Sequence, residues 1–224
     1  MPNVWVYIDG FNLYNGCLRN SAFRWLNLYH LATMLLPNDT IGKVKYFTAK
    51  VQSRVNDPDQ HIRQQVYWQA LRTVPQIEII QGHFLTKEAS MPDAASVQAL
   101  RVQAAAGVNV IGQRPQMVRV MKTEEKGTDV NLAAHLVHDA HLNRFDTAVV
   151  ISNDSDLKEA IRLVRIEVNK IVGVYIPHTF SIASDQLQKN TDFFRRINDS
   201  DFRASQFPDP VIAGGRPIIK PVGW

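Results

Sequence analysis

The chain has 224 residues, of which 45% are hydrophobic, and this is enough for one well-packed domain with an insertion. A chain that is disordered throughout is therefore excluded, and the formal net charge of +4 permits a polyanionic partner without requiring one. The single cysteine, Cys17, cannot form an internal disulfide, and no apolar run is long enough to span a bilayer. We therefore expect a soluble cytoplasmic protein without a targeting segment or a membrane partner.

Short β-rich runs alternate with helical stretches along most of the chain, which is typical of an α/β domain with a mainly parallel sheet. Strands are expected at residues 4–8, 43–49, 76–80, 148–151 and 170–175, with an edge or hairpin strand at 116–121. The strands at 4–8 and 148–151 are mostly apolar, so we expect them at the centre of the sheet.

Three helices are predicted from apolar residues that recur at helical spacing. The first begins at Asp57-Pro58, where a capping residue precedes a proline. The second begins at Thr128 and the third at Asp154. Their apolar stripes are expected to face the core.

Two stretches depart from this alternation. Residues 83–114 are interpreted as an insertion or lid-like segment, with an alanine-rich helix around residues 94–106. Residues 201–224 are rich in proline and glycine, so we expect an extended tail there. The main domain is accordingly expected to span residues 1–200.

Four aspartates stand at the ends of predicted strands or at the starts of predicted helices. Asp9 ends the first strand, Asp154 and Asp156 follow the strand at 148–151, and Asp129 opens the second helix in register with its core-facing residues. Each has an ordinary explanation as a turn residue, a helix cap or an acid in a first helical turn. Any one of these positions is therefore weak evidence for a site.

The conjunction of the four acids is more informative than any one of them. If their elements share one parallel sheet, the four carboxylates meet at its carboxyl edge, where ligands bind in open α/β sheets. Their mutual repulsion would cost stability unless a cation neutralised it. Oxygen-only ligands favour Mg²⁺ or Mn²⁺, whereas zinc on His135, His138 and His141 is a weaker alternative because no cysteine is available as a partner.

Three segments, in their order along the chain, resemble the signature segments of NYN domains of the LabA-like branch in the PIN-like nuclease superfamily. They are Asp9-Gly10-Phe11-Asn12, Lys126-Gly127-Thr128-Asp129-Val130 and Ser152-Asn153-Asp154-Ser155-Asp156. The resemblance covers roughly residues 4–177. It implies a three-layer α/β/α, PIN-like fold with a central, mainly parallel sheet and a metal-dependent endoribonuclease site.

The resemblance also implies roles for individual residues. Asp9, Asp129, Asp154 and Asp156 would hold Mg²⁺ or Mn²⁺ and act in catalysis together with Asn12, and the substrate contacts would come from Ser152, Lys126 and Asn12. Two positions depart from the family pattern. Asn153 stands where a glycine is usual, and His135 stands where many members carry another acid, which leaves open whether one or two metal ions bind.

These observations predict a ribonuclease in which a metal-activated water attacks a phosphodiester bond of RNA. Bases would stack on aromatic side chains such as Tyr14 or Trp68. The alternative is a catalytically weak RNA-binding or regulatory module, which His135 favours. A phosphatase of the haloacid dehalogenase type fits less well, because Asp9 has no second acid beside it. The sequence does not determine whether the protein forms a homo-oligomer.

Overall fold

The computed structural model describes residues 2–53, 56–177 and 184–224. They divide into two compact units, the first formed by Met1–His83 with Lys126–Trp224 and the second by Phe84–Glu125. Across the described ranges, no helix combines the length and the apolar character that crossing a lipid bilayer requires.

Seven strands form the central sheet, in the spatial order β4-β3-β2-β1-β5-β6-β7. Their bounds are β1 Asn3–Asp9, β2 Thr40–Ala49, β3 Ile77–Pro92, β4 Met117–Lys126, β5 Thr147–Ile151, β6 Ile171–Ile176 and β7 Phe193–Arg196. Each pairing between neighbours from β3 to β7 in this order is parallel. The apolar strands β1 and β5 lie side by side in the middle of the sheet, as their sequences predict.

The helices alternate with these strands along the chain, and the last helix follows β7. Their bounds are α1 Gly10–Leu13, α2 Leu28–Leu35, α3 Gln60–Arg72, α4 Ala94–Ala105, α5 Thr128–His141, α6 Lys158–Arg162, α7 Asp185–Lys189 and α8 Asp199–Ala204. Shorter turns of other helical types extend two of them, with η1 Tyr14–Leu18 after α1, η2 Ser155–Leu157 before α6 and η3 Leu163–Glu167 after it. A two-stranded antiparallel sheet, β8 Val211–Ala213 with β9 Arg216–Ile218, follows α8.

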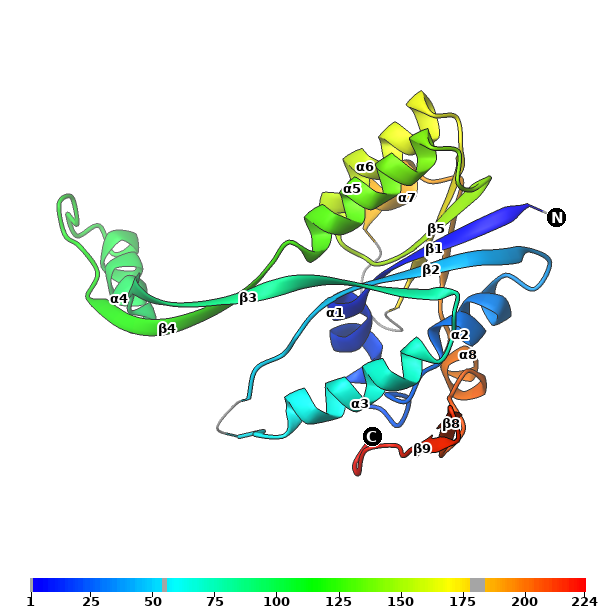
Figure 1. The fold of residues 1–224 in the computed structure, drawn as a ribbon. Helices are drawn as coiled ribbons and strands as arrows, with labels where there is room; N and C mark the ends of the chain where they lie inside the picture. The colour runs from blue at the N-terminus through cyan, green and yellow to red at the C-terminus, as the bar shows by residue number, and fades with distance from the viewer. Residues whose placement is uncertain (1, 54–55, 178–183) are drawn as a thin grey trace. The chain divides into compact units, whose positions relative to one another are not determined.

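Helices cover both faces of the sheet in the first unit (Figure 1). The alternation of side chains along β1 explains this, because successive residues of a strand point to opposite faces. Val6 and Ile8 belong to the core that includes α2, α3 and α8. Tyr7 belongs to the other core, beneath Leu136 of α5 and Ile161 of α6. The predicted three-layer α/β/α architecture with a mainly parallel sheet is therefore confirmed.

Three details of the helices differ from the sequence expectation. The helix expected to begin at Asp57-Pro58 begins at Gln60, because Asp57 forms an ion pair with Arg63 and does not cap the helix. The helix expected from Asp154 is divided into η2, α6 and η3. Helix α2, which Asn27 caps by accepting hydrogen bonds from two backbone amides, was not predicted.

The second unit contains α4, the outer part of β3 and most of β4. Asp93 caps α4 by accepting a hydrogen bond from the Ser96 amide at 2.8 Å. Residues of α4 are all exposed or half-buried. The segment begins where the insertion was expected and extends eleven residues or so beyond residue 114, since β4 runs to Lys126. A role as a lid stays a prediction.

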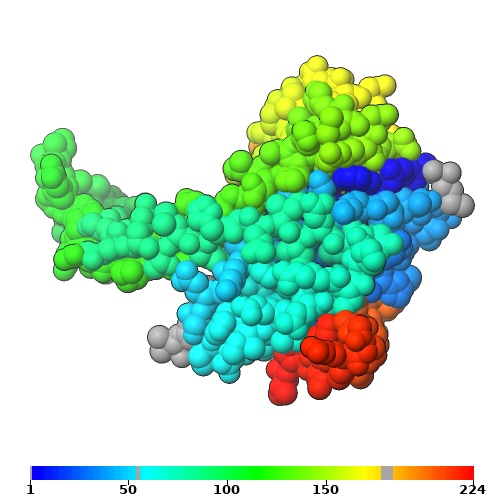
Figure 2. Space-filling model, viewed as in Figure 1, coloured from blue at the N-terminus to red at the C-terminus, as the bar shows by residue number. Residues whose placement is uncertain are grey.

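The C-terminal segment differs from the extended tail expected at residues 201–224. Its first residues complete α8, and Phe202, Phe207 and Val211 are buried in the core of the first unit. The indole nitrogen of Trp25 donates a hydrogen bond to the Pro208 carbonyl at 3.0 Å. The β8–β9 hairpin lies against α3, as the red and cyan surfaces in Figure 2 show. Apolar residues spaced along a Pro- and Gly-rich stretch thus anchor it to the core.

Candidate active site

Parallel pairing brings the carboxyl ends of β1 and β5 to one edge of the sheet. Ile8 is the register partner of Ile151, so Asp9 and Ser152 are the next residues along two neighbouring strands. On the other side of β1, Asp9 is in register with Phe47 of β2. The first and third sequence motifs therefore meet where open α/β sheets bind their ligands.

Asp9 is 4% exposed, and both of its carboxylate oxygens accept hydrogen bonds. Oδ1 accepts from the Asn12 amide at 2.9 Å, which caps α1, and Oδ2 accepts from the Ser152 hydroxyl at 2.9 Å. The carboxylate is therefore fixed from its own helix and from the neighbouring strand.

Further hydrogen bonds join the two motifs into one structure. The Ser152 hydroxyl accepts from the Asp154 amide at 3.0 Å, and the Asn12 side-chain oxygen accepts from the Asn153 amide at 3.1 Å. Asn153 accepts in turn from the Ser184 amide at 3.0 Å, which gives this departure from the usual glycine a structural use. Ser152, expected from the sequence to contact substrate, has a fully buried side chain, and its hydroxyl joins the Asp9 carboxylate to the Asp154 backbone amide.

The residue after Asp9 is Gly10, and the backbone at this glycine approaches β2 closely. A Cβ atom at this position would lie 2.6 Å from the Phe47 carbonyl oxygen and 2.7 Å from the Tyr46 ring. Any side chain would therefore push the start of α1, and the Asp9 carboxylate with it, away from β2.

Burial raises the pKa of Asp9, and the negative charge of Asp154 raises it further. The hydrogen bonds from Asn12 and Ser152 lower the pKa in part, without cancelling the effect of burial. Ionised Asp9 is thus held in an environment that would be stabilised by a nearby positive charge.

Asp129 and Asp156 are placed differently from Asp9 and Asp154. Asp129 is half-buried in the first turn of α5, and Asp156 is exposed and lines a surface groove between α5 and α6 together with His138. The Asp154 carboxylate accepts a hydrogen bond from the Asp156 backbone amide at 3.0 Å, whereas the Asp156 carboxylate is exposed at the groove. In the described parts of the chain, no three His, Cys, Asp or Glu side chains are grouped so that they could hold a metal ion.

This donor set suits one class of metal site. Mg²⁺ keeps several of its waters and is commonly bound through one or two carboxylates together with substrate phosphates. Asp9 and Asp154, whose charges interact, are two carboxylates that could serve as such a pair of oxygen ligands. A site with four protein acids, as the sequence suggested, would require Asp129 and Asp156 to move from their positions.

Lys126, another expected substrate contact, is an exposed residue at the end of β4. Gly127 follows it with a φ of 92°, which favours glycine, and α5 begins directly afterwards. The second motif therefore forms the entry into α5.

A second group of charges, which the sequence analysis missed, lies beneath α5. The Asp139 carboxylate is 0% exposed and accepts hydrogen bonds from Lys45 at 2.5 Å, from the Tyr7 hydroxyl at 2.9 Å and from Arg144 at 2.8 Å. Lys45 also lies 3.1 Å from Nδ1 of His135. Burial and the charge of Lys45 lower the pKa of His135. The signal available in the sequence was a lysine between apolar residues of β2 and an aspartate on the core-facing side of α5.

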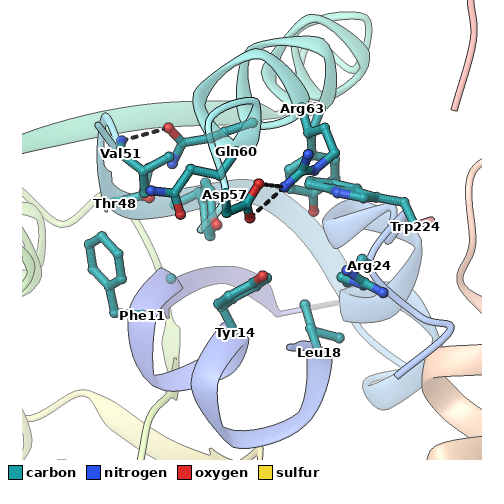
Figure 3. A pocket seen from close by; sticks show the side chains of 14 residues that line it. Phe11, Tyr14, Leu18, Arg24, Thr48, Val51, Asp57, Gln60, Arg63 and Trp224 are labelled. Carbon is teal, nitrogen blue, oxygen red and sulfur yellow. Dashed lines mark hydrogen bonds and ion pairs between the residues drawn. The ribbon is translucent and has the colours of Figure 1, made fainter. Parts of the chain in front are cut away.

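A cavity of about 120 Å³ lies next to Asp9. Figure 3 shows Phe11, Tyr14 and Leu18 on one side of it and the Asp57–Arg63 ion pair on the other. Tyr14 lines this cavity, whereas Trp68, the other aromatic residue considered for base stacking, is buried and 4% exposed.

Comparison with known proteins relates this chain to one family. The sequence model of the NYN domain matches residues 3–198. The 6-hydroxy-3-succinoylpyridine 3-monooxygenase HspA of Pseudomonas putida is 30% identical over 252 aligned positions, covering 98% of this chain and 74% of that protein. A crystal structure of a protein of unknown function from Vibrio parahaemolyticus has a TM-score of 0.54 at 20% identity, covering 90% of this chain and 95% of that one, and supports the fold alone. Because the family model spans most of the chain, this protein belongs to the NYN domain family.

Proposed function

We propose that this protein hydrolyses phosphodiester bonds of RNA at the Asp9–Asp154 edge of the sheet, with Mg²⁺ or Mn²⁺ as its cofactor. The observation that carries the proposal is the state of Asp9. Its two carboxylate oxygens are oriented by hydrogen bonds from Asn12 and Ser152, and burial raises its pKa, with a smaller contribution from the charge of Asp154. Membership in a family of nuclease-like domains supports the same function.

In this proposal, Asp9 and Asp154 hold the divalent cation. When bound, the cation supplies a polarised water as nucleophile and neutralises charge on the phosphoryl oxygens. Ser152 and Asn12 keep the Asp9 carboxylate in a fixed orientation and hold the backbone that carries Asp154, so little reorganisation accompanies the reaction. Burial of Asp9 limits the access of bulk water, which strengthens electrostatic interactions at the edge of the sheet.

The test compares cleavage of a fluorescent single-stranded RNA in Mn²⁺ by the wild-type protein and by Asp9→Asn. We expect the substitution to lower the rate by about 100-fold or more, because a cation contributes several kcal/mol to such a reaction. Asp146→Asn is the matched control, since Asp146 is an exposed carboxylate that precedes β5 at the opposite end of the strand. Equal rates for wild type and Asp9→Asn refute the proposal.

RNA binding, measured beside cleavage, distinguishes the alternative in which the protein is an RNA-binding module. If RNA binds equally well with and without a chelator and is not cleaved, the protein acts as a binding module. In a nuclease, Ser152→Ala lowers the cleavage rate by about 10- to 100-fold, because the variant retains both acids and loses the hydroxyl that joins the Asp9 carboxylate to the Asp154 backbone amide.

A second candidate function is transfer of an oxygen atom from O₂ to a small heteroaromatic ring. Two observations favour it, the similarity to a protein named as a pyridine monooxygenase and the ring-sized cavity next to Asp9. Such a reaction also consumes a two-electron donor. Oxygen uptake that depends on 6-hydroxy-3-succinoylpyridine and a reduced nicotinamide, in a preparation that does not cleave RNA, would replace the first proposal.

A further inference from the structure

Five aromatic side chains contribute to the wall of the cavity next to Asp9. Those that line it are Phe11, Tyr14, Tyr46, Tyr67 and Trp224. The Tyr67 and Trp224 rings are 5.5 Å apart between centroids, so this part of the wall is packed. Phe11, Tyr14 and Trp224 are half-buried, which leaves ring faces and edges within reach of a ligand from solvent. A lining of this kind favours a planar ligand.

The size of the cavity limits the ligand further. Its volume of about 120 Å³ is close to the roughly 150 Å³ of an engineered protein cavity that binds benzene. This space matches a single six-membered ring more closely than the two fused rings of a purine.

The polar groups of the cavity favour a negative charge on the ligand. The Arg24 guanidinium lines the cavity and donates through Nε to the Ser21 carbonyl at 3.2 Å, and it forms no ion pair with an acid in the described residues. By contrast, Arg63 is neutralised by both oxygens of Asp57, at 2.5 and 2.6 Å. Burial raises the pKa of Tyr46 to about 12, so this hydroxyl stays neutral. Arg24 therefore gives the cavity an excess of positive charge.

The cavity and the candidate active site share a stretch of chain. Gly10 and Phe11, the two residues after Asp9, line the cavity. Because consecutive Cα atoms are about 3.8 Å apart, the backbone that lines the cavity begins about that distance from the Cα atom of Asp9. A substituent on a ring in the cavity can extend to the edge of the sheet where Asp9 lies.

We propose that this cavity binds a single six-membered planar ring that carries an anionic group, with the ring between Tyr14 and the other aromatic residues and the anion on Arg24. Two sources share this chemistry, a pyrimidine nucleotide of an RNA strand and a free pyridine carboxylate. The first source deepens the proposed ribonuclease function and rests on it, since it makes the cavity a pyrimidine subsite beside the scissile bond. The binding site itself does not depend on RNA cleavage.

Isothermal titration calorimetry on the whole chain tests the proposal with three probes, uridine monophosphate, adenosine monophosphate and nicotinate. We expect a single-ring anion to bind at least about tenfold more tightly than adenosine monophosphate, because the smaller ring matches the size of the cavity more closely. Binding of uridine monophosphate identifies the nucleotide source, and binding of nicotinate alone identifies the small acid. Equal affinity for the purine, or no binding of either single-ring probe, overturns the proposal.

Two substitutions locate the binding to the cavity. Tyr14→Ala removes a stacking surface and weakens binding about tenfold. Arg24→Gln removes the charge and weakens binding by a similar factor, whereas Arg19→Gln, a matched control at an exposed residue outside the cavity lining, leaves it unchanged. If Tyr14→Ala does not fold, Arg24→Gln against Arg19→Gln decides alone, and equal affinities of these two variants contradict the site.

The outcome for this site is separable from the outcome for cleavage. Ring binding without RNA cleavage removes the ribonuclease proposal and leaves the ring site. RNA cleavage without ring binding removes the ring site and leaves the ribonuclease proposal, because Asp9 and Asp154 then act without a subsite in this cavity.

Discussion

Asp139 is the residue whose substitution should most clearly reveal the electrostatic coupling between α5 and the sheet. Its carboxylate is 0% exposed and accepts hydrogen bonds from Lys45, Tyr7 and Arg144. Asp139→Asn keeps the shape of the side chain and removes the charge. Lys45, which is 3% exposed, then keeps a buried ammonium group without a carboxylate partner. Breaking a buried pair in this way costs about 3–5 kcal/mol of the free energy of unfolding.

The reverse substitution should cost less. Lys45→Met keeps the length of the side chain, and the Asp139 carboxylate retains its hydrogen bonds from Tyr7 and Arg144. We expect a loss of about 1–3 kcal/mol. The double variant Lys45→Met/Asp139→Asn buries neither charge, so its loss should be smaller than the sum of the two single losses by about 2 kcal/mol.

Urea unfolding followed by tryptophan fluorescence measures these free energies. Asp146→Asn, at an exposed carboxylate, serves as the control and should cost less than about 1 kcal/mol. The reasoning is refuted if Asp139→Asn costs no more than this control. It is also refuted if the two single losses add without coupling, because the pair would then contribute no interaction of its own.

Three further predictions concern other parts of the first unit. Gly10→Ala places a Cβ 2.6 Å from the Phe47 carbonyl oxygen, so the urea midpoint should fall and the rate of any Asp9-dependent reaction with it, and an unchanged midpoint would contradict this packing. Lys45→Met should raise the pKa of His135, measured by NMR titration, because it removes the charge of Lys45. In the wild type, the folded pKa of His135 lies below the ordinary 6.5. The stability contributed by the neutral imidazole is therefore complete above pH 6.5 and is lost as the pH falls through the folded pKa. Phe207→Ala should cost about 3 kcal/mol in urea unfolding, whereas a loose C-terminal segment would tolerate it.

The strands at the centre of the sheet could be predicted because burial on both faces requires a continuous apolar run. Such runs end at Asp9 and at Ser152, and the structure places both strands in the middle. The C-terminal hairpin could not be predicted in this way. Its anchoring depends on the contact of Phe207 and Val211 with a core formed by distant segments, and the local composition does not indicate that contact.

Some features of the candidate site could likewise be predicted from the sequence, and others could not. The meeting of Asp9 and Asp154 follows from parallel pairing of two strands, which the alternation of elements already indicated. The position of Asp156 depends on the geometry of η2, where Asp154 accepts a hydrogen bond from the next-but-one amide. The Lys45–Asp139 pair depends on packing between β2 and α5. Neither of these is visible in residue spacing alone.

At Asp9, the structural and the functional explanation of the residue are compatible. An ionised carboxylate offers about four lone-pair sites. The Asn12 amide occupies one on Oδ1 and the Ser152 hydroxyl one on Oδ2, and the Phe11 amide also donates to this carboxylate. At least one lone pair remains for a cation or a water. Capping α1 is therefore what holds Asp9 in a single orientation at the sheet edge, and the Asp154 carboxylate, which caps η2, lies close enough for its charge to act on Asp9.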